Sequence, residues 1–227
     1  MNHCYILGKS IAVFAFCTYF LLILAPIATM MDKRDTVYEL WNHLDEFYQS
    51  NQLKQVLTEN DWVSNSVGSE DLDHILVMTQ QLQDQLFPDV PVEFVLAIIS
   101  AESSFIQDLH GFNDDSGLMQ VIPKWHKERI AKYLWDDSVD IFDVRVNLAT
   151  GMDYLSELLE LADGDYILAA MCYNEGPDKA IPRYRRGSVS AYAEIVYYRM
   201  QVIKQALNTS YGRSGRYAEN KAASEIY

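Results

Sequence analysis

A glutamate at the end of a long apolar run is the first feature of this 227-residue sequence that indicates chemistry. Residues 92–101 place apolar side chains on nearly every side of a helix, and Glu102 follows them directly. A buried carboxylate without a partner costs several kcal/mol unless it stays protonated. Two interpretations are open on spacing alone. Glu102 either emerges into water or pairs with a buried cation at the helix end, or it is a general acid with a raised pKa in an apolar cleft.

Four short blocks, beginning with Glu102, follow one another along the chain. The first is Glu-Ser-x-Phe at 102–105, and the second is Gly-Leu-Met-Gln at 117–120 with a proline at 123. The third is Asn-x-x-x-Gly-x-x-Tyr-Leu at 147–155, and the fourth is Tyr-Asn-x-Gly at 173–176. Each block alone is a weak signal, but four in this order are a strong one. The set resembles the lytic transglycosylase family of the soluble type, which has a goose-type lysozyme-like fold, over about residues 90–185.

The resemblance implies an enzyme that cleaves the β-1,4 bond between N-acetylmuramic acid and N-acetylglucosamine in peptidoglycan glycan strands and leaves a 1,6-anhydromuramyl end. Glu102 would then be the only catalytic group, first as acid and then as base, so its pKa should lie near the working pH. The substrate-binding residues that the resemblance implies are Ser103, Ser116, Gly117, Met119, Gln120, Tyr173, Asn174 and Glu175.

Several of these residue types suit a sugar cleft. Met119 would offer an apolar surface to the sugar, Gln120 both a donor and an acceptor, and Gly117 a close approach of the backbone. The resemblance implies that the Tyr173 hydroxyl binds the catalytic carboxylate. On composition alone, core packing is the favoured interpretation of both Met119 and Tyr173. Three residues of the third block are interpreted as holding the fold: Asn147, Gly151 and Tyr154.

Two positions depart from the family's usual pattern. Asp114-Asp115 stand where many members have Gly-Ala, and Glu175 stands where alanine is usual. Negative charge near the cleft would raise the pKa of Glu102 further. It could also position a water molecule, so a muramidase, which is a hydrolase on the same fold, is an alternative.

The composition excludes several classes of protein. Eighteen Lys and Arg against 32 Asp and Glu give a formal net charge of −14, which argues against a general nucleic-acid binder and a basic peripheral membrane protein. A hydrophobic content of 49% allows a sizeable core. No metal-binding motif is present, so neither a metal nor a cofactor is expected. A small basic cluster, formed by Arg183, Arg185 and Arg186, either meets carboxylates of the cell wall or faces solvent.

The first 31 residues differ in kind from the rest. No charged side chain occurs from residue 10 to residue 31, and the apolar run is long enough to span a bilayer. It is longer than the core of a typical signal peptide, and the candidate cleavage sites near Ala25 and Ala28 are poor. We therefore expect a membrane anchor that holds the chain at the periplasmic face of the inner membrane, in the cell envelope. A cleaved signal peptide and secretion are the alternative.

The elements that must position the site are helices. Apolar residues at helical spacing predict helices at about 33–57, 72–86, 92–102, 144–161 and 190–207, and loops are expected at 103–116 and around Gly176 and Pro182. The predicted fold is all-α, with a membrane anchor or signal segment at 1–31 and a helical spacer at 32–70. A lysozyme-like catalytic domain follows at 71–207 and a flexible tail at 208–227.

Taken together, the sequence predicts a membrane-anchored peptidoglycan lytic transglycosylase. A catalytically inactive wall-binding or assembly module is a second alternative beside the muramidase. The presence of Glu102, Gln120 and Tyr173 argues against it. Nothing in the sequence names a protein partner.

Overall fold

The computed structural model describes residues 49–136 and 138–224, with side chains as far as residue 208. The expected anchor at 1–31 and the first part of the expected spacer lie outside the described residues. In the described part, no helix has the length and apolar character that crossing a bilayer requires.

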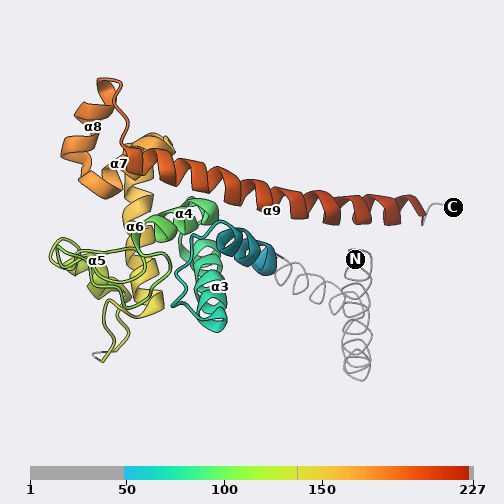
Figure 1. The fold of residues 1–227 in the computed structure, drawn as a ribbon, viewed down its shortest axis with the longest axis horizontal. Helices are drawn as coiled ribbons and strands as arrows, with labels where there is room; N and C mark the ends of the chain where they lie inside the picture. Colours follow the sequence, from blue (N-terminus) through green and yellow to red (C-terminus); the bar gives the residue numbers. More distant parts are fainter. Residues whose placement is uncertain (1–48, 137, 225–227) are drawn as a thin grey trace. The chain divides into compact units, whose positions relative to one another are not determined.

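The described part of the chain is built from helices, as expected (Figure 1). Residues 49–59 are helical. The helices that follow are α3 (Ser69–Leu86), α4 (Val92–Glu102), α5 (Lys127–Tyr133), α6 (Val144–Leu161), α7 (Tyr166–Glu175), α8 (Pro177–Arg185) and α9 (Ala191–Ser224). Extended pairing among these residues is limited to two isolated bridges, which join Ser116 to His110 and to Val121. The prediction of an all-α fold is confirmed for this part.

Helix α4 lies at the centre of the core. All of its residues from Phe94 to Ser100 are buried, and the helix packs against α3 and α9. Helix α6 packs against α3, α5 and α7, and α7 in turn packs against α8 and α9. An all-round apolar helix is stable only when other helices enclose it, and this enclosure places the end of α4 inside the molecule.

Aspartates fix the starts of two helices next to the site. The Asp143 carboxylate accepts hydrogen bonds from the N–H groups of residues 145 and 146 at the start of α6. Asp165 caps α7 in the same way. An N-cap carboxylate satisfies N–H groups that have no partner within the helix and complements the helix dipole.

The packed unit begins earlier than the sequence suggested. Leu53, Leu57 and Trp62 belong to the same hydrophobic core as α4 and α6, and residues from Gln49 onward form one compact unit. The predicted boundary between a spacer at 32–70 and a domain at 71–207 therefore does not match the packing. At the other end, the last helix was expected to end near residue 207 but continues to Ser224.

Candidate active site

Glu102 occupies the last position of α4, where the buried helix meets a turn. The turn is unusual, because Ser104 and Phe105 have φ angles of +49° and +67°. Such values are rare for residues other than glycine. Phe105 is fully buried, and the N–H of Ser64 donates to the Ser104 carbonyl at 3.0 Å. Packing and this hydrogen bond hold the chain in the turn that ends α4 at the glutamate.

The pKa of Glu102 is raised from 4.5 to about 7. Desolvation by burial is the largest cause, and the negative charge of Asp115 raises the pKa further. A hydrogen bond from Tyr192 acts in the opposite direction because it stabilises the carboxylate. The interpretation of Glu102 as a buried acid with a raised pKa thus agrees with the structure, and no cation pairs with it among the described residues.

The hydroxyl on the carboxylate comes from Tyr192 of α9. Its Oη donates to Glu102 Oε1 at 2.5 Å. Tyr192 is not among the predicted site residues, because it lies 90 residues from Glu102 and belongs to none of the four blocks. Only the packing of α9 against α4 brings the two side chains together.

Tyr173 has a different partner from the one expected. Its hydroxyl donates to the main-chain carbonyl of Met119 at 2.7 Å and not to Glu102. The expectation that Tyr173 binds the carboxylate was therefore wrong for this structure. Tyr173 still lies beside the site, because burial and then the charge of Glu102 raise its pKa well above 10.

The side chain of Asn147, in α6, fixes the second block through hydrogen bonds to the backbone. Its Oδ1 accepts from the Met119 N–H at 2.8 Å, and its Nδ2 donates to the carbonyls of Ser116 and Ile141 at 2.9 Å each. Gly117 has a φ of +73°, and a Cβ there would lie 2.3 Å from Asn147 Nδ2. Glycine is therefore required by both backbone angle and space.

Met119 is a packing residue in this structure. Its side chain is fully buried, with 0% exposed, and a Cβ on Gly151 would lie 2.4 Å from its Sδ. The expected apolar surface for a sugar is not present at this position. The expectation that Asn147 and Gly151 hold the fold agrees with these contacts.

The other predicted polar residues of the first two blocks mainly bind the backbone. Gln120, at a φ of +47°, donates through Nε2 to the carbonyls of Leu109 at 3.1 Å and Gly117 at 2.8 Å. Ser116 donates to the carbonyl of Asp114 at 3.1 Å, and Ser103 donates to the carbonyl of Ile99 at 3.2 Å. The bonds of Gln120 and Ser116 stiffen the loop that follows α4, and the bond of Ser103 lies at the end of α4 itself.

The two extra acidic positions behave differently. Asp115 raises the pKa of Glu102, as expected. Glu175 instead forms an ion pair with Arg183 at 3.3 Å and is not among the groups that shift Glu102, so that part of the expectation was wrong. Asn174, beside it, is exposed.

A cavity of about 60 Å³ lies next to Tyr173. Its lining includes Gln120, His126, Thr150, Gly151 and Tyr154. The Thr150 hydroxyl is buried without a hydrogen-bond partner among the described residues. A buried polar atom of this kind usually binds an ordered water.

Residues 82–193, just under half of the chain, match the family model of the transglycosylase SLT domain. Among curated proteins, no sequence matches the chain. The chain is similar to the structure of an inactive mutant of the lytic transglycosylase Slt from Pseudomonas aeruginosa, with 21% identity over 63% of this chain and 24% of that one, and a TM-score of 0.42. It is also similar to the 70 kDa soluble lytic transglycosylase of Escherichia coli, with 17% identity over 73% of this chain and 30% of that one, and a TM-score of 0.44. The chain thus spans less than a third of the length of either protein.

Proposed function

We propose that this chain, whose residues 82–193 match the family model of the transglycosylase SLT domain, is a peptidoglycan lytic transglycosylase with Glu102 as its only catalytic acid and base. The observation that carries the proposal is the buried position of Glu102 and its raised pKa. Its carboxyl ends a buried helix, has a pKa of about 7 and is held at one oxygen by Tyr192. At neutral pH, a group with this pKa is about half protonated, so it can both donate and accept a proton.

The first step uses protonated Glu102 as the acid. Its proton passes to the glycosidic oxygen, and the bond from that oxygen to C1 of N-acetylmuramic acid breaks. The N-acetylglucosamine side leaves with the proton as a hydroxyl. The N-acetyl group of the muramyl residue stabilises the positive charge that develops at C1, in the place of the second carboxylate of most glycosidases.

The second step uses Glu102 as the base. The carboxylate takes the proton of the C6 hydroxyl, whose oxygen attacks C1 and closes the 1,6-anhydro ring. Glu102 ends protonated, as it began, and no water is consumed. The Tyr192 hydrogen bond supports this step, because it stabilises the carboxylate that exists between the two proton transfers.

The remaining predicted residues are proposed to shape the cleft. The stiff loop around Gly117 and Gln120 would border the sugar beside Glu102. Ser116 would hold the backbone of this loop, and Ser103 the end of α4. Asn174 is exposed and would contact the glycan strand directly. The small cavity beside Tyr173, with the free Thr150 hydroxyl, suits a compact polar substituent such as an N-acetyl group.

One observation favours hydrolysis as a second candidate. Asp115 is near enough to Glu102 to raise its pKa, so a water held by Asp115 could attack C1 in place of the C6 hydroxyl. The product would then be a reducing muramic acid end, and the protein would be a muramidase.

Digestion of purified peptidoglycan by the full chain tests both candidates. We expect cleavage, with muropeptides that are lighter by one water than hydrolysis products. Glu102→Gln should abolish cleavage while the protein stays folded. The matched control is Glu160→Gln, an exposed glutamate of α6, which should cleave like the wild type. A Glu102→Gln variant that still cleaves would refute the assignment, and reducing ends would replace the lyase with the muramidase.

The proposed substrate also implies a location. Peptidoglycan lies outside the cytoplasmic membrane, so we propose that the catalytic unit works in the cell envelope, with residues 1–31 as its anchor. Fractionation of cells that produce the full chain tests the anchor. The chain should remain with the membranes after a high-salt wash, and its release by salt alone would contradict an apolar anchor.

A further inference from the structure

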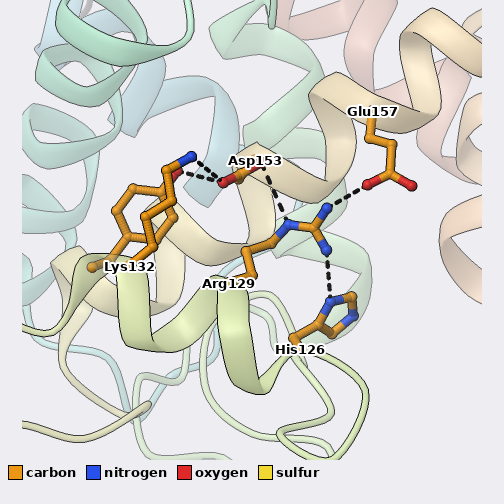
Figure 2. A network of polar contacts seen from close by, with 6 residues as sticks. His126, Arg129, Lys132, Asp153 and Glu157 are labelled. Atoms are coloured by element: carbon orange, nitrogen blue, oxygen red, sulfur yellow. Dashed lines mark hydrogen bonds and ion pairs between the residues drawn. The ribbon is translucent and has the colours of Figure 1, made fainter.

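Arg199 of α9 is a partly buried cation without an anion beside it. Among the side chains that the structure describes, three arginines are half-buried: Arg129, Arg183 and Arg199. Arg129 pairs with Asp153 and Glu157 of α6, as Figure 2 shows. Arg183 pairs with a carboxylate at the end of α7. Arg199 forms no ion pair with any described residue.

Arg199 contacts two uncharged groups instead. Its Nη1 donates to the hydroxyl of Ser100 at 3.0 Å, and its guanidinium lies 5.2 Å from the centre of the Trp62 ring. The ring face attracts a cation only modestly, and neither group neutralises the charge. Burial accordingly lowers the pKa of the Arg199 guanidinium. A neutral side chain could fill this space without the cost of desolvating a charge, so packing does not explain an arginine here.

Arg199 lies on the same face of α9 as Tyr192. Positions 192 and 199 are about two helical turns apart, a spacing that places both side chains on one side of a helix. Both of them reach α4, where Tyr192 binds Glu102 and Arg199 binds Ser100. Burial and the charge of Glu102 raise the pKa of the Tyr192 hydroxyl well above its usual value, whereas the charge of Arg199 lowers it.

A cation beside a hydroxyl strengthens the hydroxyl as a hydrogen-bond donor, because it stabilises negative charge on the oxygen. Tyr192 has a single hydroxyl hydrogen and donates it to Glu102 Oε1 at 2.5 Å. This bond lowers the pKa of Glu102. The charge of Arg199 should therefore reach Glu102 through Tyr192, and Arg199 is not among the groups that act on Glu102 directly.

The other charged groups around this pair act differently. Asp115 raises the pKa of Glu102, and Tyr173 of α7 raises the pKa of Tyr192. A second cation that α9 directs at α4, Lys204, is paired with Glu93 at 3.6 Å. Arg199 is thus the only cation among the described groups that shift the pKa of Glu102 or of Tyr192.

We propose that Arg199 is a positioning residue that acts through the Tyr192 hydroxyl and sets the pH range in which Glu102 can both donate and accept a proton. Its meaning for catalysis rests on the proposed function, whereas its effect on Glu102 does not. Ser100 and Trp62 hold the guanidinium in place, one from α4 and the other from the segment before α3.

The first test compares profiles of kcat/KM against pH on soluble glycan strands. Arg199→Gln and Arg199→Met both remove the charge, and two neutral variants are used so that loss of the fold in one still leaves a test. In both, the alkaline limb should move to higher pH by about half a unit. Arg199→Lys keeps the charge and should keep the limb. Lys204→Gln is the matched control on the same helix and should keep the limb as well.

A merely structural role predicts another result. Activity would then fall at every pH without a movement of the limb, and Arg199→Lys would not restore it. A double-mutant cycle adds the route of the effect, because coupled residues do not add. In the Tyr192→Phe background, Arg199→Gln should move the limb no further. An equal movement in both backgrounds would overturn the proposed action through Tyr192.

A measurement without substrate separates failure of this inference from failure of the proposed function. The glutamate carboxyls of the full chain are labelled with ¹³C, and the signal of Glu102 is identified by its loss in Glu102→Gln. The midpoint of its NMR titration should rise in Arg199→Gln and Arg199→Met but not in Arg199→Lys. This result supports the inference even if the wild type cleaves nothing. An unchanged midpoint in the neutral variants overturns it, whatever the protein cleaves.

Discussion

At the scale of single residues, the raised pKa of Glu102 links the proposed catalytic role of this residue to the stability of the fold. The folded protein keeps this proton up to about pH 7, whereas the unfolded chain releases it near pH 4.5. Between these values the folded state binds more protons, so its stability falls as the pH rises. The cost reaches about 3 kcal/mol above pH 7, since one pKa unit corresponds to about 1.4 kcal/mol. The proposed catalysis at neutral pH would therefore depend on a group that weakens the fold.

We predict that Glu102→Gln stabilises the protein in a pH-dependent way. The gain should be close to zero below pH 4.5, where Glu102 is neutral in both states, and should approach about 3 kcal/mol above pH 7. Urea unfolding at a series of pH values measures it. Glu160→Gln should show no such trend, and a gain for Glu102→Gln that is equal at all pH values would contradict the raised pKa.

The two tyrosines near Glu102 should have separable effects. Tyr192→Phe removes a hydrogen bond that lowers the pKa of Glu102, so the alkaline limb of the pH–rate profile should move to higher pH. Tyr173→Phe leaves the Met119 carbonyl without its partner, which should cost about 1–3 kcal/mol of stability and leave the limb in place. Profiles of kcat/KM against pH, with urea unfolding of each variant, distinguish the two. A limb that moves in Tyr173→Phe and not in Tyr192→Phe would reverse these roles.

A site residue could be predicted from the sequence only where the feature that marks it lies close to it in the chain. Glu102 could be recognised because its apolar neighbours precede it directly in the chain. Tyr192 could not, since its contact with Glu102 exists only after α9 packs on α4. The partner of Tyr173 was missed for the same reason, because a carbonyl 54 residues away competes for its hydroxyl.

At the scale of elements, Asn147 connects α6 to the loop that borders the site. It satisfies the Met119 N–H and the carbonyls of Ser116 and Ile141, and all of these groups are in buried positions. Asn147→Ala should therefore cost more than about 3 kcal/mol of stability. Asn174→Ala, at an exposed position, should change stability by less than about 0.5 kcal/mol. Thermal or urea unfolding measures both, and similar losses for the two variants would show that the loop is not held in this way.

The helices with strong apolar periodicity were predicted well, and those without it were missed. The predicted bounds of α4 and α6 coincide with the observed ones, because long buried faces repeat at helical spacing. Helix α5 has no buried residue, and α8 buries only Ala180, so neither leaves a periodic signal. Helix α8 also contains Pro177 and Pro182, which suggested a loop. Pro177 is tolerated because it stands in the first turn, where no N–H is needed.

At the scale of the whole molecule, negative charge prevails both in the chain as a whole and beside the candidate site. The net charge of −14 should keep the protein away from anionic membranes and wall polymers. Asp115, whose charge acts on Glu102, is acidic as well. Capture of an anionic wall polymer must therefore come from specific contacts at the site, because the overall field of the molecule opposes it.

Residues 53–62 pack with the unit that carries Glu102, which gives the last prediction. Leu57 is fully buried, with 0% exposed, and Trp62 packs under Arg199 of α9 at 5.2 Å. Arg199 also donates to Ser100 of α4 at 3.0 Å, so this segment braces the two helices that carry Glu102 and Tyr192. In the full chain, Leu57→Ala should lower the free energy of unfolding of the whole unit by about 2–5 kcal/mol, in a single transition. The control is Val77→Ala, at an exposed position of α3, which should change the free energy of unfolding by less than about 0.5 kcal/mol. An independent spacer would behave differently, because Leu57→Ala would then leave the unfolding of the Glu102 region unchanged.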